Sequence, residues 1–350
     1  MSEDRLDSFR DRILERKPLR VRGGGSKDFY GGPSNGELLE TISHAGIVNY
    51  EPTELVITAR CGTPLADLES ALAARRQCLP CEPPHFGAAT VGGAVAAGLS
   101  GPRRAAVGSL RDFILGVKLM DGEGRVHRFG GEVMKNVAGF DVSRLLTGSL
   151  GTLGLILEVS LKVLPVTPGD ASLRFEMPQD KALEALNRWA GQPLPLVASC
   201  WQDGVLTLRL AGARAAVDSA CARLGGSVVA QPEAAEFWQG LRQQSAEFFA
   251  GEAALWRLSV PSVAPPLELP AATLIEWGGA QRWMRGDADP SRMRDVAARA
   301  GGHATLFRGG DKSGGVFSPL PPALMEVHRR LKQSFDPYGV FNPGRLYPEF

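Results

Sequence analysis

Residues 18–32 read PLRVRGGGSKDFYGG, so three consecutive glycines follow a short predicted strand, 19–22. Because glycine has no Cβ, such a run either turns sharply or lets another group approach the main chain closely. Arg22 and Lys27 flank the run with positive charge, and Ser26 adds a hydroxyl donor. This pattern indicates an anion, most often a phosphate, held by main-chain N–H groups. A flexible surface loop is the alternative, and the rest of the chain decides between the two.

Length and composition are typical of a soluble globular protein. The chain has 350 residues, which is enough for two domains, and 44% hydrophobic and 22% charged residues, which is ordinary for such proteins. A formal net charge of +1 provides no overall field for nucleic acid or anionic lipid. The sequence has no apolar run of 18 residues, and its charged N-terminus is unlike a signal peptide. We therefore expect a cytoplasmic protein without a nucleic-acid partner.

The five cysteines are scattered, as in proteins of a reducing compartment. Cys78 and Cys81 form a single CxxC step without a second pair or nearby histidines. A zinc site needs four ligands, so we expect two ordinary thiols and no metal, with a redox pair as the alternative.

Hydrophobic patterning predicts a first domain over residues 1–167. Its expected elements are a helix over 4–16, a strand over 55–59, a helix over 63–77 that Thr63 caps, a hairpin over 113–129 and a strand over 153–164.

A second domain is predicted over residues 168–315. Residues 170–230 follow the order β-α-β-β-α-β of a ferredoxin-like unit. After a helix at 232–250, a partial second round is expected, with strands near 255–259, 271–277, 281–285 and 304–308 and a helix near 290–300. The tail, 316–350, contains one helix and then FDPYGVFNPGRLYPEF, which we expect to return to the first domain.

Two common nucleotide-binding patterns are absent from the sequence. GxGxxG fails because Asp28 stands where the last glycine belongs, and no glycine-lysine-Ser/Thr step follows a glycine loop, as a P-loop requires. The sequence instead contains three glycine-bearing stretches, one after another along the chain. They are RGGGS (22–26), EPPHFGAATVGGAVAAGLSGPRR (82–104) with VGSLRD (107–112) close behind, and the stretch 136–159 that contains GSLGTLGLI (148–156).

Together with FNPGR (341–345), these stretches resemble the FAD-binding domain of the vanillyl-alcohol oxidase/para-cresol methylhydroxylase family. The resemblance implies an α+β fold, in which a two-part FAD-binding domain carries a smaller ferredoxin-like cap. It also implies which residues bind FAD. One side of the pyrophosphate would contact Arg22, Gly23, Gly24, Gly25, Ser26 and Lys27, and the other Thr90, Gly92, Gly93, Ser100 and Gly101. Gly108 and Asp112 belong to the matching motif, and Gly148, Ser149, Gly151, Gly154 and Ile156 would contact the adenosine or flavin portions.

Within that family the chain is similar to the FAD-binding subunits of bacterial glycolate oxidases, through IEWGGAQRWMR (275–285) and GGHATLFRGGDK (301–312). This likeness implies a complex with two partners, a larger FAD-containing subunit like D-2-hydroxyacid dehydrogenases and an iron–sulfur subunit. The substrate implied is a small 2-hydroxy acid, glycolate, which becomes glyoxylate while electrons leave through iron–sulfur clusters. Such a complex would lie at the inner face of the membrane through its partners.

Two departures from the family pattern carry information. Some members attach FAD through a histidine in the first glycine loop, but RGGGS has none nearby, and no cysteine lies between Pro83 and Arg104. We therefore predict non-covalent FAD. The related dehydrogenases also use a histidine pair, whereas the five histidines here are not at ligand spacing.

Oxidation of a 2-hydroxy acid needs a base for the hydroxyl proton and a cation for the carboxylate. The catalytic residue is unknown from the sequence. The candidates are His303, Arg282 or Arg308 for the carboxylate, and Asn342 near the flavin.

Three functions remain open. The first and favoured one is an FAD-binding subunit of a multi-subunit 2-hydroxyacid oxidase whose substrate chemistry occurs chiefly on a partner. The second is a self-sufficient FAD-dependent alcohol or hydroxyacid dehydrogenase. The third is a non-catalytic assembly subunit whose flavin site is structural or vacant.

Overall fold

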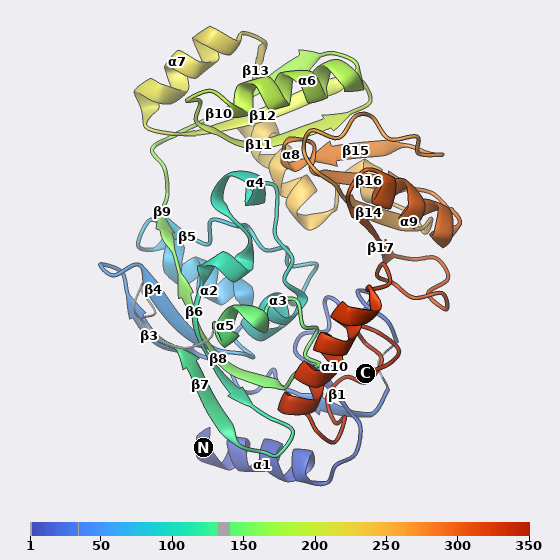
Figure 1. Cartoon of the computed structure of the whole chain (residues 1–350). Coiled ribbons are helices and arrows are strands. Elements are labelled where there is room, and N and C mark those ends of the chain that lie inside the picture. Colours follow the sequence, from blue (N-terminus) through green and yellow to red (C-terminus); the bar gives the residue numbers. More distant parts are fainter. Residues whose placement is uncertain (1, 34, 132–140) are drawn as a thin grey trace.

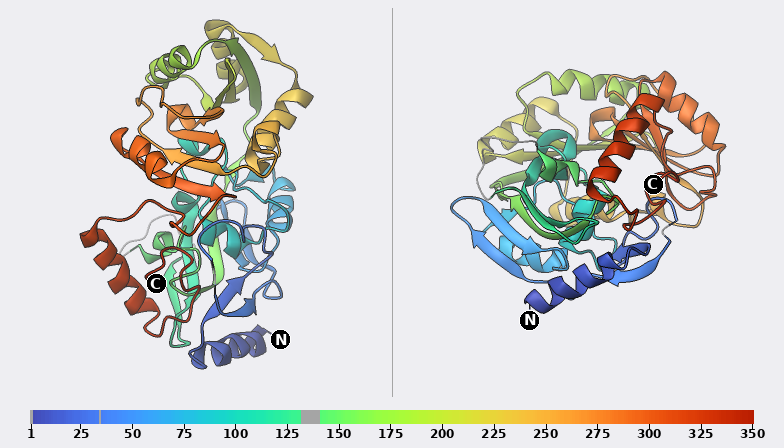
Figure 2. Two further views of the ribbon diagram at one scale, coloured as in Figure 1. Left: turned by 90° about the vertical axis from the view of Figure 1, so that its right-hand side faces the viewer. Right: turned by 60° about the horizontal axis from the view of Figure 1, so that its bottom comes forward.

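The computed structural model describes residues 2–33, 35–131 and 141–350, so residues 136–140 of the third glycine-bearing stretch lie outside the described residues. Two sheet-based units lie one above the other (Figure 1). The lower unit contains both ends of the chain, and the upper unit, which we call the cap, consists of residues 169–308 (Figure 2). The predicted domain boundary near Pro168 stays a prediction.

A five-stranded antiparallel sheet is the centre of the lower unit, in the order β3-β4-β8-β6-β7. Its strands are β3 (Ile47–Glu51), β4 (Val56–Arg60), β6 (Ile114–Met120), β7 (Val126–Gly130) and β8 (Leu155–Lys162). Helix α2 (Leu65–Ala73) packs on this sheet through Leu65, Leu68 and Leu72, because their spacing puts them on one helical face. The remaining elements here are β5 (Gln77–Cys78), β9 (Leu164–Pro165), α3 (Val91–Ala97), α4 (Arg104–Val107), η1 (Leu110–Phe113) and α5 (Val142–Leu145).

The first and last segments of the chain share one core. Strand β1 (Leu19–Arg22) pairs in parallel with β2 (Glu37–Glu40), and Leu19 also bridges to Phe341 of the tail. Helix α1 (Ser2–Leu14) adds Phe9 and Ile13 to this cluster. Helix α10 (Pro322–Phe335) belongs to the tail, and the chain after it lies beside the lower unit (Figure 1). The predicted assignment of residues 316–350 to the first domain stays a prediction.

The cap sheet has eight strands in the order β13-β10-β12-β11-β15-β16-β14-β17. Its first half is the predicted β-α-β-β-α-β unit: β10 (Gly169–Glu176), α6 (Gln179–Ala190), β11 (Leu196–Gln202), β12 (Val205–Gly212), α7 (Arg214–Leu224) and β13 (Ser227–Val229). The second half is β14 (Leu255–Ser259), β15 (Thr273–Glu276), η3 (Trp277–Gly279), β16 (Gln281–Arg285), α9 (Pro290–Arg299) and β17 (His303–Arg308). The two halves run in mirrored order and join where β11 pairs with β15. The second half therefore has all four strands of a β-α-β-β-α-β unit, but residues 260–272, which form no helix, stand in place of its first helix.

A third layer lies between the cap sheet and the lower unit. It consists of α8 (Gln231–Gln243) and η2 (Glu247–Phe249), which occupy the predicted helix 232–250. Trp238 of α8 contributes to a hydrophobic cluster that also contains Tyr30 and Leu150 of the lower unit and Phe307 of the cap. The two units are therefore joined by a common apolar core beside the glycine loop.

One local prediction was wrong. Thr63 does not cap α2, which begins at Leu65 after Pro64, since its hydroxyl is bonded instead to both main-chain groups of Gly46, at 2.9 and 3.1 Å. Within the described residues, no helix is long and apolar enough to cross a bilayer.

Candidate functional site

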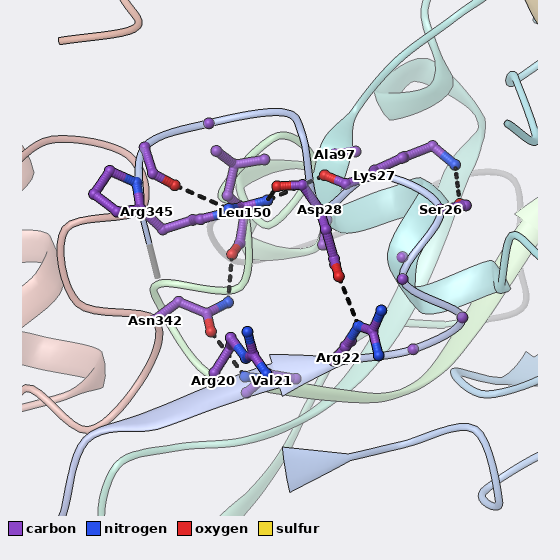
Figure 3. Close-up of a pocket in the computed structure, with 18 of the residues that line it drawn as sticks. Arg20, Val21, Arg22, Ser26, Lys27, Asp28, Ala97, Leu150, Asn342 and Arg345 are labelled. Atoms are coloured by element: carbon purple, nitrogen blue, oxygen red, sulfur yellow. Dashed lines mark hydrogen bonds and ion pairs between the residues drawn. The ribbon is translucent and has the colours of Figure 1, made fainter. Parts of the chain in front are cut away.

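A cavity of about 550 Å³ lies in the lower unit, where the glycine loop, α3, the turn at Leu150 and the tail meet (Figure 3). Its lining includes the predicted residues Arg22, Gly23, Gly24, Gly25, Ser26, Lys27, Thr90, Gly93 and Asn342. It also includes Ala96 and Ala97, which belong to the smooth surface expected in the second glycine-bearing stretch. Several other lining residues were not among the predicted contacts: Arg20, Asp28, Leu150, Asp311, Lys312, Ser313 and Arg345.

The glycines of the loop allow another protein segment to approach. A Cβ on Gly23 would lie 2.3 Å from Thr90 Oγ1, and a Cβ on Gly24 would lie 1.5 Å from the carbonyl oxygen of Ala88. Real Cβ atoms are not found that close to backbone oxygen, so residues 88–90 occupy the space that side chains would need. The two glycine-bearing stretches therefore meet to form one wall of the cavity.

Unused donors are concentrated on that wall. Among the described residues, the main-chain N–H groups of residues 23–27 have no acceptor within hydrogen-bond distance. Successive N–H groups of this kind favour an anion such as a phosphate.

Positive charge dominates the lining. It contains five cations, Arg20, Arg22, Lys27, Lys312 and Arg345, and two carboxylates, Asp28 and Asp311. Asp28 is already bonded to Arg22 at 2.7 Å, and Asp311 accepts from the Ser313 amide and hydroxyl at 2.8 and 2.7 Å. The cavity therefore presents more positive charge than its own acids compensate.

Lys27 is the cation most affected by its surroundings. Burial lowers its pKa to about 8. Its Nζ lies 3.3 Å from Ser26 Oγ and 3.2 Å from the His85 carbonyl oxygen, both neutral groups. A bound anion would restore the stability of the charged form, so Lys27 fits a phosphate-bearing ligand.

Asn342 connects three distant segments beneath the cavity (Figure 3). Its Oδ1 accepts from the Val21 amide at 2.8 Å, and its Nδ2 donates to the Leu150 carbonyl at 2.7 Å. The side chain is 5% exposed, and both ends of its amide are occupied. Asn342 therefore shapes the site, and this geometry does not support the catalytic role considered for it.

A smaller cavity of about 70 Å³ adjoins the first and shares Gly23, Gly93 and Asn342 with it. Its deeper lining contains the predicted residues Gly92, Gly151, Gly154 and Ile156, together with Thr41 and Cys61. Burial raises the pKa of the Cys61 thiol to about 12, so this thiol stays protonated and unreactive at neutral pH.

Six predicted contact residues line neither of these two cavities. Ser100 accepts from the Leu110 amide, Asp112 forms a capping box with Ser109, and Ser149 donates to the Leu146 carbonyl. The other three, Gly101, Gly108 and Gly148, are glycines. Gly101 receives the Trp277 indole N–H on its carbonyl, whereas Gly108 and Gly148 have positive φ at turns. These positions build the loops around the site.

Of the three candidates in the cap, the two arginines are bonded to main-chain carbonyls and His303 lines neither of the two cavities. Arg282 is 1% exposed and donates to the carbonyls of Gly279, Ala264 and Pro265. Arg308 donates to the Phe249 carbonyl, and His303 is an exposed residue at the start of β17. In the described part of the chain, no group of three or more His, Cys, Asp or Glu side chains is arranged to hold a metal ion.

Three cations of the lining were not predicted from the sequence. Two of them lie in sequence contexts that could have indicated a place in the site. Lys312 lies in GGDKSGG (309–315), which repeats the glycine, serine and lysine composition of the first loop. Arg345 directly follows the NPG turn and donates to the Lys27, Asp28 and Gly32 carbonyls. Arg20 belongs to an alternating strand, and nothing in the sequence distinguished it.

Comparisons with known proteins agree with the fold and with FAD as the cofactor. A protein-family model described as an FAD binding domain matches residues 13–130. The solved structure of p-cresol methylhydroxylase with substrate bound superposes with a TM-score of 0.72 at 13% identity, covering 100% of this chain and 88% of that one. The chain is therefore an FAD-binding protein with the fold of p-cresol methylhydroxylase and a ferredoxin-like cap.

Sequence relatives define the family more closely. The chain is 49% identical to glycolate oxidase subunit GlcE of Escherichia coli K12, over 99% of this chain and 98% of that protein. It is also 31% identical to glycolate oxidase subunit GlcD of Bacillus subtilis, over 43% of this chain and 32% of that protein. The chain belongs to the family of glycolate oxidase subunit GlcE, and its cofactor is FAD.

Proposed function

We propose that this chain is the FAD-binding subunit of a glycolate oxidase complex and that substrate oxidation occurs chiefly on a larger FAD-containing partner subunit. An iron–sulfur subunit would receive the electrons, and the complex would lie at the inner membrane face through its partners. The observation that carries the proposal is the cation-rich cavity, with its unused N–H groups, in a chain similar to GlcE along its whole length.

The residues of the cavity fit the parts of FAD. The N–H groups of residues 23–27 and the Lys27 ammonium would hold the pyrophosphate, since both donate to anionic oxygen. Gly92, Gly93 and Ala96 offer a surface without long side chains, against which a flat ring can lie. Bound FAD supplies an acceptor for a hydride from a substrate C–H bond.

The positions of the candidate catalytic groups support substrate oxidation on a partner subunit. The Arg282 guanidinium is committed to three carbonyls, and His303 lies outside the cavity. The carboxylates of the lining, Asp28 and Asp311, are bonded to neighbouring donors. These contacts favour a cofactor-bearing subunit over a self-sufficient dehydrogenase.

We further propose that FAD is held without a covalent bond. The one thiol in the lining of the two cavities described is Cys61, whose raised pKa makes it a poor nucleophile. Acid precipitation of the purified protein should release the yellow colour into the supernatant. Colour that stays in the pellet would contradict this proposal.

An anaerobic visible spectrum of the purified chain tests its function. We expect an oxidised flavin spectrum that glycolate leaves unchanged and that dithionite bleaches. Bleaching by glycolate alone would show that this chain has its own active site, and would support the self-sufficient dehydrogenase. A protein without flavin that does not bind added FAD would contradict the proposed cofactor site.

A further inference from the structure

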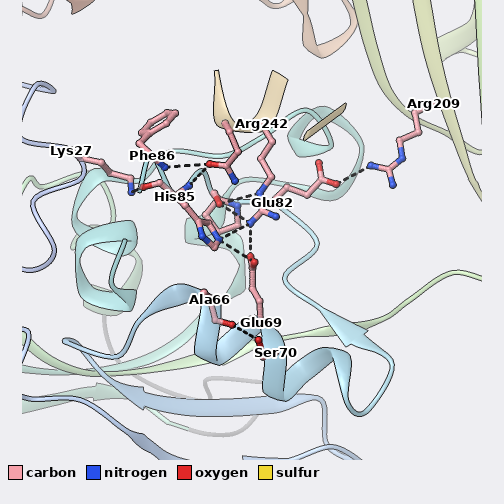
Figure 4. Close-up of polar contacts among 11 residues, drawn as sticks. Lys27, Ala66, Glu69, Ser70, Glu82, His85, Phe86, Arg209 and Arg242 are labelled. Carbon is pink, nitrogen blue, oxygen red and sulfur yellow. Dashed lines mark hydrogen bonds and ion pairs between the residues drawn. The ribbon is translucent and has the colours of Figure 1, made fainter. Parts of the chain in front are cut away.

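The segment Pro83–Phe86 lies between Lys27, which lines the cofactor cavity, and Arg242 of helix α8 in the cap (Figure 4). Two consecutive side chains of α8 hold its main chain. Arg242 donates to the Pro83 carbonyl from Nη2 at 2.9 Å and from Nε at 3.3 Å. Gln243 Oε1 accepts from the amides of His85 and Phe86, at 3.0 and 3.2 Å. The cap thus fixes three main-chain groups of this segment.

The same segment holds Lys27 on its other side. The His85 carbonyl accepts from Lys27 Nζ at 3.2 Å, and the Lys27 ammonium lies 5.5 Å from the centre of the Phe86 ring. Both contacts stabilise a cation, the second through the electron-rich face of the ring. Since Lys27 lines the cavity, one short segment connects α8 to a partly buried cation of the cofactor site.

Glu69 of α2 fixes the junction to the lower unit. Its carboxylate is bonded to Arg242 and lies 3.0 Å from His85 Nε2. The three side chains are 16–26% exposed, so their charges are partly removed from water and depend on one another. A displaced α8 would leave Glu69 without its arginine and release Pro83–Phe86.

We propose that Arg242 and Gln243 are positioning residues of the flavin site, which set the place of Lys27 through Pro83–Phe86 and couple the seating of the cap to the affinity for FAD. This inference rests on the proposed function, in that FAD occupies the cavity. Coupling of this kind is reciprocal, so bound FAD stabilises the contact between α8 and Pro83–Phe86 by the same factor.

The test is the dissociation constant of FAD, measured by quenching of flavin fluorescence. We expect Arg242→Met and Gln243→Leu each to weaken binding at least about fivefold, the lower end of coupling between sites. Gln243→Glu keeps the acceptor oxygen and should bind FAD within about twofold of the wild type. Arg174→Met is the matched control, because Arg174 pairs with Glu233 on the same helix without touching the segment. It should also stay within about twofold.

A double-mutant cycle separates positioning from general stability. In a Lys27→Met background, Arg242→Met should change FAD affinity by less than about twofold, because the group it positions is gone. An equal loss in both backgrounds overturns the proposal, as does wild-type affinity in both Arg242→Met and Gln243→Leu. A wild-type chain that binds no FAD refutes the proposed function as well.

Hydrogen exchange of the wild-type protein provides a second measurement that needs no variant. FAD should slow exchange of the His85 and Phe86 amide hydrogens, because both amides donate hydrogen bonds to Gln243 Oε1. Unchanged exchange of both amides at saturating FAD would also overturn the proposal.

Discussion

Lys27 shows how a single side chain adapts to a ligand. Its pKa near 8 in the free protein results from burial, and a bound pyrophosphate would raise that pKa. FAD affinity should therefore be constant below pH 8 and fall as the pH rises above it, because neutral Lys27 offers the pyrophosphate no positive charge and binds it more weakly. We expect the dissociation constant to increase about tenfold over the two pH units above 8.

The matching variant is Lys27→Met. It should bind FAD about tenfold more weakly at pH 7, which corresponds to the loss of one charge-assisted contact, and its affinity should not fall above pH 8. Titration of FAD at several pH values checks both expectations. A fall that persists in Lys27→Met would assign the pH dependence to another group.

Gly24 is a second position where the addition of a single carbon atom should prevent cofactor binding. Gly24→Ala would put a Cβ 1.5 Å from the Ala88 carbonyl oxygen, so the two walls of the cavity would have to separate. We expect this variant to be purified without flavin and with a lowered melting temperature. Gly204→Ala is the control, because Gly204 has a positive φ of 80° but no atom within 4 Å of the added Cβ. It should lose about 1–2 kcal/mol and keep its flavin, and flavin loss in both variants would contradict the close-approach explanation.

Sequence reasoning selected residues that the structure brings to one cavity where the composition was unusual. RGGGSK and TVGG stood out, and both line the cavity. Ser100 and Asp112 were expected to contact FAD through motif matching, yet their hydrogen bonds support neighbouring loops. The sequence cannot distinguish a polar group that binds a ligand from one that caps a turn beside it, since both need the same donor or acceptor.

At the scale of elements, a buried ion pair joins α10 to the chain segment that directly follows it. Lys332 Nζ bonds to Asp336 Oδ2 and to the Thr152 carbonyl, both at 2.7 Å, and to the Phe341 carbonyl at 3.0 Å. Asp336 also accepts from the amides of Val340 and Phe341. The two side chains are 8% and 0% exposed, so neither is well solvated by water.

Lys332→Met should therefore be strongly destabilising, because it leaves the Asp336 carboxylate buried and unpaired. We expect a loss of about 3–5 kcal/mol in the free energy of unfolding, measured by urea denaturation. Arg330→Met removes an exposed ion pair with Glu326 on the same helix and should cost no more than about 1 kcal/mol. Similar losses in the two variants would show that burial of the pair is unimportant.

The order of elements was largely predictable, and their ends were not. The hairpin at 113–129 and the whole of 170–230 follow alternation and turn residues, which are local properties. The N-terminus of α2 was misplaced because Thr63 satisfies Gly46, a partner 17 residues earlier in the chain. Contacts of that range override a local capping preference.

At the scale of the whole molecule, the chain segment that follows the last strand of the cap also lines the cofactor cavity. Asp311, Lys312 and Ser313 follow β17 and line the cavity, and Lys312 donates to the Phe29 and Gly31 carbonyls. FAD should therefore protect this segment against proteases. At an FAD concentration of ten times its dissociation constant, we expect tryptic cleavage after Lys312 to slow about tenfold.

Arg76 is the internal control for this experiment, since it is exposed in the turn between α2 and β5, away from the cavity. Cleavage after Arg76 should be nearly independent of FAD. Equal protection at both sites would indicate a general stabilisation of the protein and not a local contact with the cofactor.

The convergence of these segments could not be predicted from the sequence. Val21, Leu150 and Asn342 meet through one amide side chain, although Val21 and Asn342 are 321 residues apart. No local pattern specifies such a contact, which depends on the packing of β1, the Leu150 turn and the tail. Resemblance to a family indicated that FNPGR belonged with the first glycine loop, but not which atoms would join them.

The contact between Val21 and Asn342 also has a consequence for the order of events during synthesis. At typical rates of about 5–20 residues per second, the ribosome needs on the order of 16–64 s to add the 321 residues that separate them. During that interval the whole cap, which is continuous in sequence, is synthesised, whereas the glycine loop still lacks its partner. The nascent polypeptide should therefore capture its flavin only after Asn342 has left the ribosome, because the contacts of its amide side chain complete the floor of the site.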